Sequence, residues 1–167
     1  YRMWAKTRLR HLAPWVEGWQ LDEMFADVEG RGAADASYTT ALRIELCKLM
    51  GEDFAGAAAD IYKCFDQIQR PLLYETLKKA GMPGGVLEAY KKFQEAMKVR
   101  STIAGGLGEE YVRKTSIPQG DPFSMMNVAL IMRPWMKQMK AVGVIPRILA
   151  DDLQIFTSGD RHLENLT

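Results

Sequence analysis

Acidic residues inside apolar segments limit the fold of this chain more than any other feature. Asp60 lies in the apolar segment 57–62, which is predicted to form a buried strand. Asp151 and Asp152 stand between two short apolar segments, which predict a hairpin with the pair at its tip. Isolated carboxylates in apolar strands are costly, and three that converge repel one another unless a cation such as Mg²⁺ neutralises them. Taken alone, the same residues would equally fit a strand-end cap and an ordinary turn.

The pattern of apolar and turn residues predicts an α+β fold. Prolines and glycines mark where most helices and turns begin and end, and Pro134 is expected to kink or end the helix that contains it. The order indicates an antiparallel or mixed sheet with helices on one face. The first 55 residues are predicted to be mostly helical, with a loop at 30–36. The other expected elements are a strand at 57–62, helices starting at Pro71 and Pro83, strands at 99–103 and 111–117, a helix at 122–142, and strands at 145–150 and 153–157.

Composition excludes several classes of protein. The 167 residues carry a net charge of +1, with 47% hydrophobic and 26% charged residues, which excludes a disordered tail or a collagen-like fibre. Two cysteines are too few for a disulfide scaffold or a four-cysteine zinc site, so the chain is expected to be reduced and intracellular. The longest strictly apolar run, 128–132, is far too short to span a membrane. Because Tyr1 stands first without a signal-peptide pattern, we expect a piece of a longer protein.

Charge is segregated along the chain. Residues 17–60 are mainly acidic, whereas residues 78–114 are mainly basic and residues 122–150 contain no acid. A positive surface favours a phosphate backbone because bound lysine and arginine displace condensed counterions. The charges therefore permit a nucleic-acid partner, although solvated helix faces would give the same pattern.

Three segments in series resemble the palm motifs of reverse transcriptases from non-LTR retrotransposons. Residues 60–66 (DIYKCFD) resemble D-x-x-K-A-F-D, residues 117–124 (IPQGDPFS) resemble x-x-QG-x-P-x-S, and residues 149–152 (LADD) resemble YADD. The helical segment 77–83 follows the pattern L-x-x-x-G-x-P, and residues 30–36 (GRGAADA) resemble the fingers segment. The likeness covers nearly the whole chain in the right order, and three such motifs with sensible spacers are a specific signal.

The resemblance implies a fold and a reaction. Residues 56–167 are expected to form a polymerase palm, an antiparallel sheet backed by helices, and residues 1–55 a partial, mostly helical fingers region. The thumb is expected to be absent, so that the isolated piece polymerises little. The implied activity is RNA-directed DNA polymerisation, in which a primer 3′-hydroxyl attacks a dNTP by a two-metal mechanism. The implied partners are an RNA template, a DNA primer, dNTPs and the rest of a parent polyprotein with a thumb and an endonuclease, acting in the nucleus and without a membrane.

The resemblance also assigns the metal site. Asp60 and Asp151 are expected to bind both Mg²⁺ ions, with Asp152 as the third carboxylate and Mn²⁺ as a substitute metal. The backbone carbonyl of Ile61 is expected to reach the metal that carries the triphosphate. Arg31 is a candidate contact to a phosphate or to the template.

The nucleotide-binding residues follow from the same motifs. Backbone N–H groups around Cys64 and Phe65 are expected to face the triphosphate. The Phe65 ring matches the steric gate that leaves no room for a 2′-hydroxyl. Gln119 and Gly120 match the loop that packs against the incoming nucleotide, where glycine allows a close backbone approach.

The chain departs from the family pattern at three positions. Leu149 stands in place of an aromatic residue, Cys64 in place of alanine, and Asp121 adds a negative charge beside the predicted phosphate-binding loop. Two alternatives remain: an RNA-dependent RNA polymerase palm, which usually has glycine before the paired aspartates and lacks the Phe65 pattern, and a non-catalytic nucleic-acid-binding scaffold. Scaffolds of that kind tend to lose the carboxylates, and this chain keeps all three.

Overall fold

The computed structural model of the chain describes residues 1–26, 28 and 30–166. It divides into two compact units, each made of two separate stretches. One unit contains residues 1–17 and 63–124, and the other contains residues 18–62 and 125–167. The expected boundary at residue 55 between fingers and palm stays a prediction.

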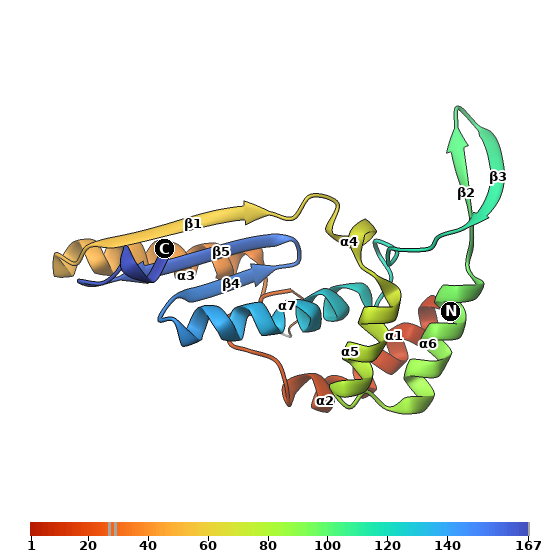
Figure 1. The fold of residues 1–167 in the computed structure, drawn as a ribbon, viewed down its shortest axis with the longest axis horizontal. Coiled ribbons are helices and arrows are strands. Elements are labelled where there is room, and N and C mark those ends of the chain that lie inside the picture. The colour runs from red at the N-terminus through yellow and green to blue at the C-terminus, as the bar shows by residue number, and fades with distance from the viewer. Residues whose placement is uncertain (27, 29, 167) are drawn as a thin grey trace. The chain divides into compact units, whose positions relative to one another are not determined.

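The second unit is built on an antiparallel sheet of three strands in the order β1-β5-β4 (Figure 1). The strands are β1 (Phe54–Asp60), β4 (Ile145–Leu149) and β5 (Asp152–Ser158). The hairpin predicted around Asp151 and Asp152 is therefore confirmed. On its outer edge β4 forms a parallel bridge between Ile148 and Met24.

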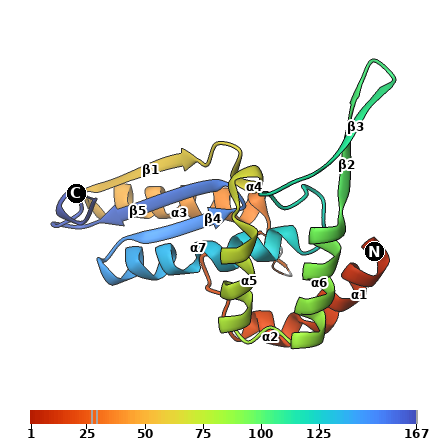
Figure 2. The ribbon, with the colours of Figure 1, turned by 45° about the vertical axis from the view of Figure 1, so that its right-hand side comes forward.

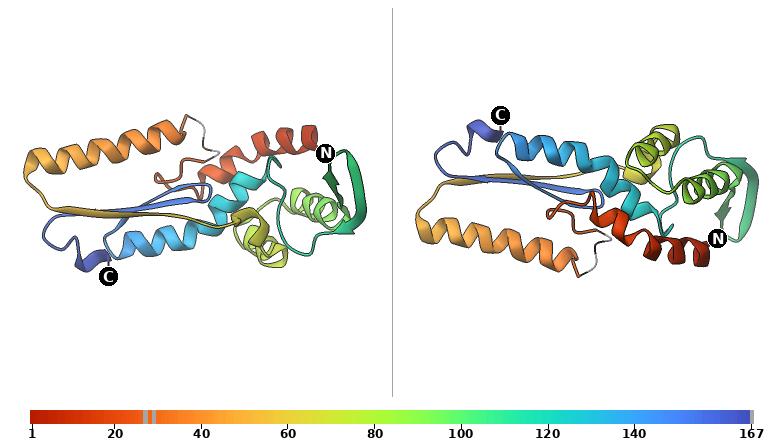
Figure 3. Two further views of the ribbon diagram at one scale, coloured as in Figure 1. Left: turned by 90° about the horizontal axis from the view of Figure 1, so that it is seen from above. Right: turned by 90° about the horizontal axis from the view of Figure 1, so that it is seen from below.

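Helices cover both faces of this sheet. Figure 3 shows α3 (Ala33–Met50) on one side of the strands and α7 (Ser124–Ala141) on the other. Thr40 of α3 donates to Oε1 of Gln154 in β5 at 3.2 Å. The expectation of helices on one face was wrong because Arg147 and Ile148, neighbours that face opposite ways in β4, are both buried.

The first strand is not buried, contrary to the expectation for residues 57–62. It runs from Phe54 to Asp60, and its last five residues are exposed. Because β1 pairs with β5 alone among the described strands, it forms an edge of the sheet. Three consecutive alanines give this edge little side-chain area to bury.

The first unit is mainly helical and carries one hairpin (Figure 2). The sequence predicted the second strand of this hairpin at 111–117, but the observed strand, β3, begins five residues earlier, at Gly106. Ala104 and Gly105 both have positive φ and turn the chain in two residues, so the return strand pairs with β2 at once. The elements of the unit are α1 (Arg2–His11), α2 (Ala13–Glu17), α4 (Cys64–Gln67), α5 (Arg70–Lys79), α6 (Gly84–Ala96), β2 (Lys98–Ile103) and β3 (Gly106–Val112).

The core of this unit joins α5 to α6. Arg70 is 2% exposed, and its Nη1 donates to the carbonyl of Gln94 at 2.6 Å. Tyr90 meets the rings of Tyr74 and Phe123 edge to face. Pro71 and Pro83 stand at the starts of these two helices, as the sequence predicts.

One other helix boundary differs from expectation, and one predicted helix is confirmed. Residues 30–36 are not all loop, because α3 begins at Ala33 and Oδ2 of Asp35 accepts a hydrogen bond from the Gly32 N–H at 2.8 Å. The helix predicted at 122–142 is confirmed as α7, which does not end at the exposed Pro134 but continues to Ala141. A short 3₁₀ turn, η1 (Glu164–Leu166), lies near the end of the chain.

The sequence also led to expectations about the cysteines and about membrane-spanning segments. Cys47 and Cys64 are both buried free thiols. Among the residues that the structure describes, none of the helices combines the length and apolarity that crossing a membrane requires.

The close approach of β1 to β5 predicts a stability effect at Gly56. A Cβ there would lie 2.8 Å from the backbone carbonyl oxygen of Ile155. We expect Gly56→Ala to lower the free energy of unfolding by about 1–3 kcal/mol, measured by urea denaturation. Gly85→Ala in α6 is the control, because nothing lies within 4 Å of its added Cβ, and it should be neutral or stabilising by up to about 1 kcal/mol. A Gly56→Ala chain as stable as the wild type would contradict this register.

Candidate active site

The residues predicted to form the metal site gather at one corner of the three-stranded sheet. Asp60 is the last residue of β1 and pairs directly with Asp152, the first residue of β5. Asp151 precedes it in the turn, and its carbonyl accepts a hydrogen bond from the Ile61 N–H at 3.1 Å. One backbone contact thus extends the ladder past Asp60 and fixes the turn onto the end of β1.

The turn itself holds a strained residue. Leu149 pairs with Asp152, which leaves Ala150 and Asp151 as the two turn residues. Ala150 has a φ of 59°, in the left-handed region that disfavours a side chain by roughly 1–2 kcal/mol. Such strain is found where the surrounding structure fixes a functional conformation.

The opposed pair of aspartates is unfavourable without a counter-ion. Directly opposite residues of an antiparallel pair project from the same face, with Cβ atoms about 4.5–5.5 Å apart, and like charges there are destabilising. Asp60 and Asp152 are exposed and Asp151 is partly buried. The free-energy cost of burying these carboxylates, which the sequence suggested, therefore does not apply. A cation at this corner would instead relieve the repulsion between them.

The donor set suits a hard cation. Carboxylate and backbone carbonyl oxygens are the ligands that Mg²⁺ prefers, and Asp60, Asp151, Asp152 and Ile61 offer only these. Within residues 1–26, 28 and 30–166, no three acidic, histidine or cysteine side chains converge tightly enough to form a metal site. The residues fit Mg²⁺ by type, and their role as ligands stays a prediction.

The predicted nucleotide-binding residues belong to the other unit, in two segments joined by one backbone hydrogen bond. Cys64 and Phe65 lie in α4 with buried side chains, after Lys63 in the left-handed conformation. The carbonyl of Phe65 accepts a hydrogen bond from the Ile117 N–H at 3.0 Å. Residues 64–65 are thus tied directly to the segment that leads into the Gln119 loop.

The loop at Gln119 and Gly120 is exposed and turns sharply. Gly120 has a φ of 80°, and its carbonyl accepts a hydrogen bond from Nη2 of Arg2 at 3.2 Å. Oγ of Ser124 donates to the carbonyl of Pro118 at 2.7 Å. The loop borders a cavity of about 230 Å³ within its own unit. The Gln119 side chain is thus exposed beside this cavity, while hydrogen bonds at Gly120 and Ser124 hold the loop.

Asp121 does not present its charge beside this loop, contrary to what the sequence suggested. It is 8% exposed. Its Oδ1 accepts from the Phe123 N–H at 2.9 Å, and its Oδ2 accepts from the Tyr1 hydroxyl at 2.9 Å and from Nε2 of Gln94 at 3.1 Å. Burial raises the pKa of this carboxyl, whereas the hydrogen bonds act in the opposite direction. Asp121 is therefore a buried anchor of the loop.

A local signal for this role was present in the sequence. An aspartate side chain often accepts the N–H two residues on, and Asp121 does so with Phe123. Its bonds to Tyr1 and Gln94 had no such signal, because those residues are distant in sequence.

Arg31, the candidate phosphate or template contact, is engaged locally. Its Nη1 donates to the Asp22 carbonyl at 2.6 Å, and its Nη2 pairs with the Asp22 carboxylate at 3.1 Å. In this structure its guanidinium holds the turn before α3.

Asp121→Asn provides a test of the buried anchor. Because burial raises the folded-state pKa, the wild-type chain loses stability as the pH rises from the ordinary aspartate value, about 3.9, through that raised pKa. Asparagine keeps the Oδ1 acceptor for Phe123 and Tyr1. Its new donor replaces the oxygen that accepts from Nε2 of Gln94, so the Gln94 amide has to turn over and present Oε1, which is buried without a partner. We expect the variant to lack this pH-dependent loss and to match or exceed wild-type stability at pH 7 by about 1 kcal/mol.

The measurement is urea denaturation between pH 3 and pH 8. Glu75→Gln removes an exposed carboxylate from α5 in the same unit and should leave the pH profile unchanged. An Asp121→Asn chain that keeps the wild-type pH profile would show that Asp121 is not a buried anchor.

The fold is similar to that of a solved telomerase. An apo telomerase from Candida tropicalis, truncated from its C-terminal domain, matches with a TM-score of 0.67 and 13% sequence identity. The match covers 97% of this chain and 36% of that chain, so this chain spans about a third of the telomerase. At this identity the likeness shows the shared mixed fold of helices and antiparallel sheet.

Sequence comparison identifies the family. A search of curated proteins found no significant match. The family described as reverse transcriptase (RNA-dependent DNA polymerase) matches residues 13–167. That span includes every predicted site residue and nearly the whole described fold. The chain therefore belongs to the reverse transcriptase (RNA-dependent DNA polymerase) family.

Proposed function

We propose that this chain catalyses RNA-directed DNA synthesis by adding dNTPs to a primer 3′-hydroxyl. The observation that carries the proposal is the direct pairing of Asp60 with Asp152, beside a turn that contains Asp151. Family membership supports the same reaction, because polymerases of this family copy RNA into DNA. The opposed carboxylates have no evident structural benefit, since they repel each other at an exposed sheet edge.

In this proposal the aspartate corner holds two Mg²⁺ ions. Asp60 and Asp151 would contact both ions, Asp152 would supply the third carboxylate, and the Ile61 carbonyl would complete the set. When bound, such ions activate the attacking hydroxyl and stabilise charge on the leaving phosphate. The hydrogen bond from Ile61 to the Asp151 carbonyl keeps the turn and the end of β1 together.

The buried ring of Phe65 is proposed to exclude ribonucleotides. Its backbone is held by the bond from Ile117, which limits how far the ring can move to admit a 2′-hydroxyl. Gln119 and Gly120 are proposed to pack against the incoming nucleotide. The buried hydrogen bonds of Asp121 would hold the loop in place. The N–H groups near Cys64 are proposed to face the triphosphate.

The family motifs favour a particular biological setting. We infer that the chain comes from a non-LTR retrotransposon polyprotein that acts in the nucleus on an RNA template and a DNA primer. The order of residues 60–66, 117–124 and 149–152 supports this subtype.

Asp151→Asn tests the metal assignment. In the full-length protein we expect primer extension on an RNA template to fall by a factor on the order of 10³, since a metal centre stabilises several kcal/mol of transition-state charge. In the 167-residue chain, the rise in unfolding temperature on adding Mn²⁺ should be lost as well.

The matched control is Asp53→Asn. Asp53 is an exposed aspartate just before the opposite end of β1, so this variant should keep both activity and the Mn²⁺ response. Undiminished primer extension by Asp151→Asn would refute the metal assignment.

Phe65→Val tests the proposed exclusion of ribonucleotides. Removing ring volume should lower the ratio of kcat/KM for a dNTP to kcat/KM for the matching rNTP by about tenfold or more, while dNTP addition persists. Phe65→Leu, which keeps more side-chain volume, should show a smaller change. A ratio equal to that of the wild type in both variants would count against the assignment.

A further inference from the structure

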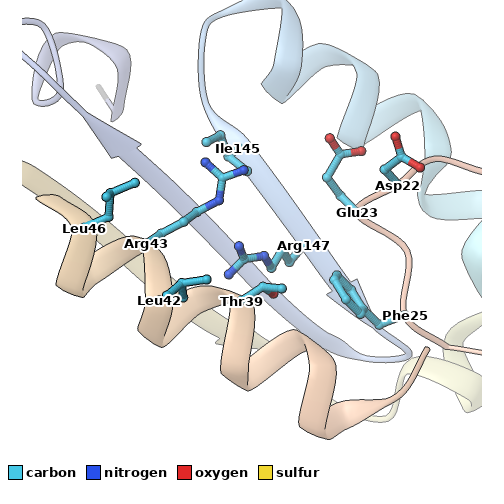
Figure 4. Close-up of a pocket in the computed structure, with 9 residues that line it drawn as sticks. All are labelled: Asp22, Glu23, Phe25, Thr39, Leu42, Arg43, Leu46, Ile145 and Arg147. Carbon is cyan, nitrogen blue, oxygen red and sulfur yellow. The ribbon is translucent and has the colours of Figure 1, made fainter. Parts of the chain in front are cut away.

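A pocket between α3 and β4 shares no residue with the aspartate corner (Figure 4). Its volume is about 480 Å³, which lies in the range of pockets that hold small organic ligands. Phe25, Leu42, Leu46 and Ile145 give it apolar walls. Figure 4 shows Arg43 from α3 and Arg147 from β4 between these walls.

The two arginines in this pocket form no ion pair with an acid among the residues that the structure describes. Arg147 is 6% exposed, and its Nη1 donates to Oγ1 of Thr40. Burial, and then the nearby positive charge of Arg43, lower the pKa of Arg147, whereas the negative charge of Glu23 acts in the opposite direction. Among the described residues, no carboxylate forms an ion pair with either guanidinium. A buried cation without an ion pair is costly, so an additional anion beside Arg147 would be favourable.

The two carboxylates that border the pocket are already engaged. Asp22 pairs with Arg31 at 3.1 Å, and Oε1 of Glu23 pairs with Nζ of Lys140 at 2.5 Å. Figure 4 shows the Glu23 carboxylate turned toward α7. Neither acid forms an ion pair with Arg43 or Arg147, although the charge of Glu23 acts on Arg147 and Oε2 of Glu23 is buried without a hydrogen-bond partner.

The chemistry of the pocket selects the ligand. Guanidinium groups bind phosphate and carboxylate oxygens in pairs. Two positive charges match a phosphate monoester, which carries about −1.5 to −2 at pH 7, better than a singly charged carboxylate or phosphodiester. The apolar walls call for a ligand with an apolar or aromatic body.

We propose that this pocket binds a phosphate monoester with an apolar or aromatic body, of the nucleoside 5′-monophosphate class. Arg43 and Arg147 hold the phosphate, and Leu42, Leu46 and Phe25 contact the body. This site does not depend on the polymerase activity proposed above, since the two share no residue.

The test titrates the 167-residue chain in phosphate-free buffer by calorimetry. The probes are adenosine 5′-monophosphate, adenosine and inorganic phosphate. The nucleotide should bind about tenfold more tightly than inorganic phosphate because of the apolar contacts, and adenosine should not bind. Adenosine binding as tightly as the nucleotide would overturn the role of the arginines. Equal affinity for inorganic phosphate and the nucleotide would overturn the role of the apolar walls.

Arg43→Gln is the main variant, because Arg43 is exposed and its loss should not unfold the chain. It should weaken nucleotide binding about tenfold or more. Lys48→Gln removes the same charge from α3 at an exposed position that does not border the pocket, and it should bind as the wild type does. Wild-type affinity in Arg43→Gln would overturn the proposal.

Arg147→Met separates a ligand contact from a structural arginine. If Arg147 serves a ligand, the methionine variant should unfold at a temperature no lower than the wild type in phosphate-free buffer, because a buried unpaired charge is removed. The rise in unfolding temperature on adding the nucleotide should disappear. A lower unfolding temperature with that rise retained would show a structural role and overturn the assignment.

Discussion

The pairing of β1 with β5 is the interaction on which the aspartate corner depends. It places Asp60 opposite Asp152, and the added bond from Ile61 to the Asp151 carbonyl includes the turn. A shift of one residue in this register would turn Asp60 to the other face of the sheet, because side chains alternate along a strand. Gly56 and the stacked rings of Phe54 and Phe156, 5.9 Å apart, favour the observed register. The chemistry of the corner is thus set by contacts at the far end of the same two strands.

Much of this architecture could be predicted from local signals. The hairpin around Asp151 and the helix starts at Pro71 and Pro83 follow from apolar runs and prolines, whose effects act within a few residues. The exposure of β1 could not be predicted, because an apolar strand does not reveal whether it has one neighbour or two. The early start of β3 was missed because Ala104 adopts a conformation that alanine rarely takes.

The candidate sites also differ in how much of each could be predicted from local sequence signals. Asp60, Asp151 and Asp152 were found because they interrupt apolar segments and stand in recognisable motifs. The anchoring role of Asp121 depends on Tyr1 and Gln94, and only the fold brings those partners together. The pair formed by Arg43 and Arg147 had no sequence signal either, since charges on a helix and on a strand usually face solvent.

The order of the strands has a consequence for how the chain is made. During translation β1 leaves the ribosome long before β5, the strand with which it pairs. The elements synthesised in between are α4, α5, α6, β2, β3, α7 and β4. Until β5 emerges, an alanine-rich segment with unpaired backbone groups is open to pairing with other chains. Contacts between such distant segments also slow folding. Nascent copies of this protein should therefore stay open to such pairing until the hairpin of β4 and β5 has been synthesised.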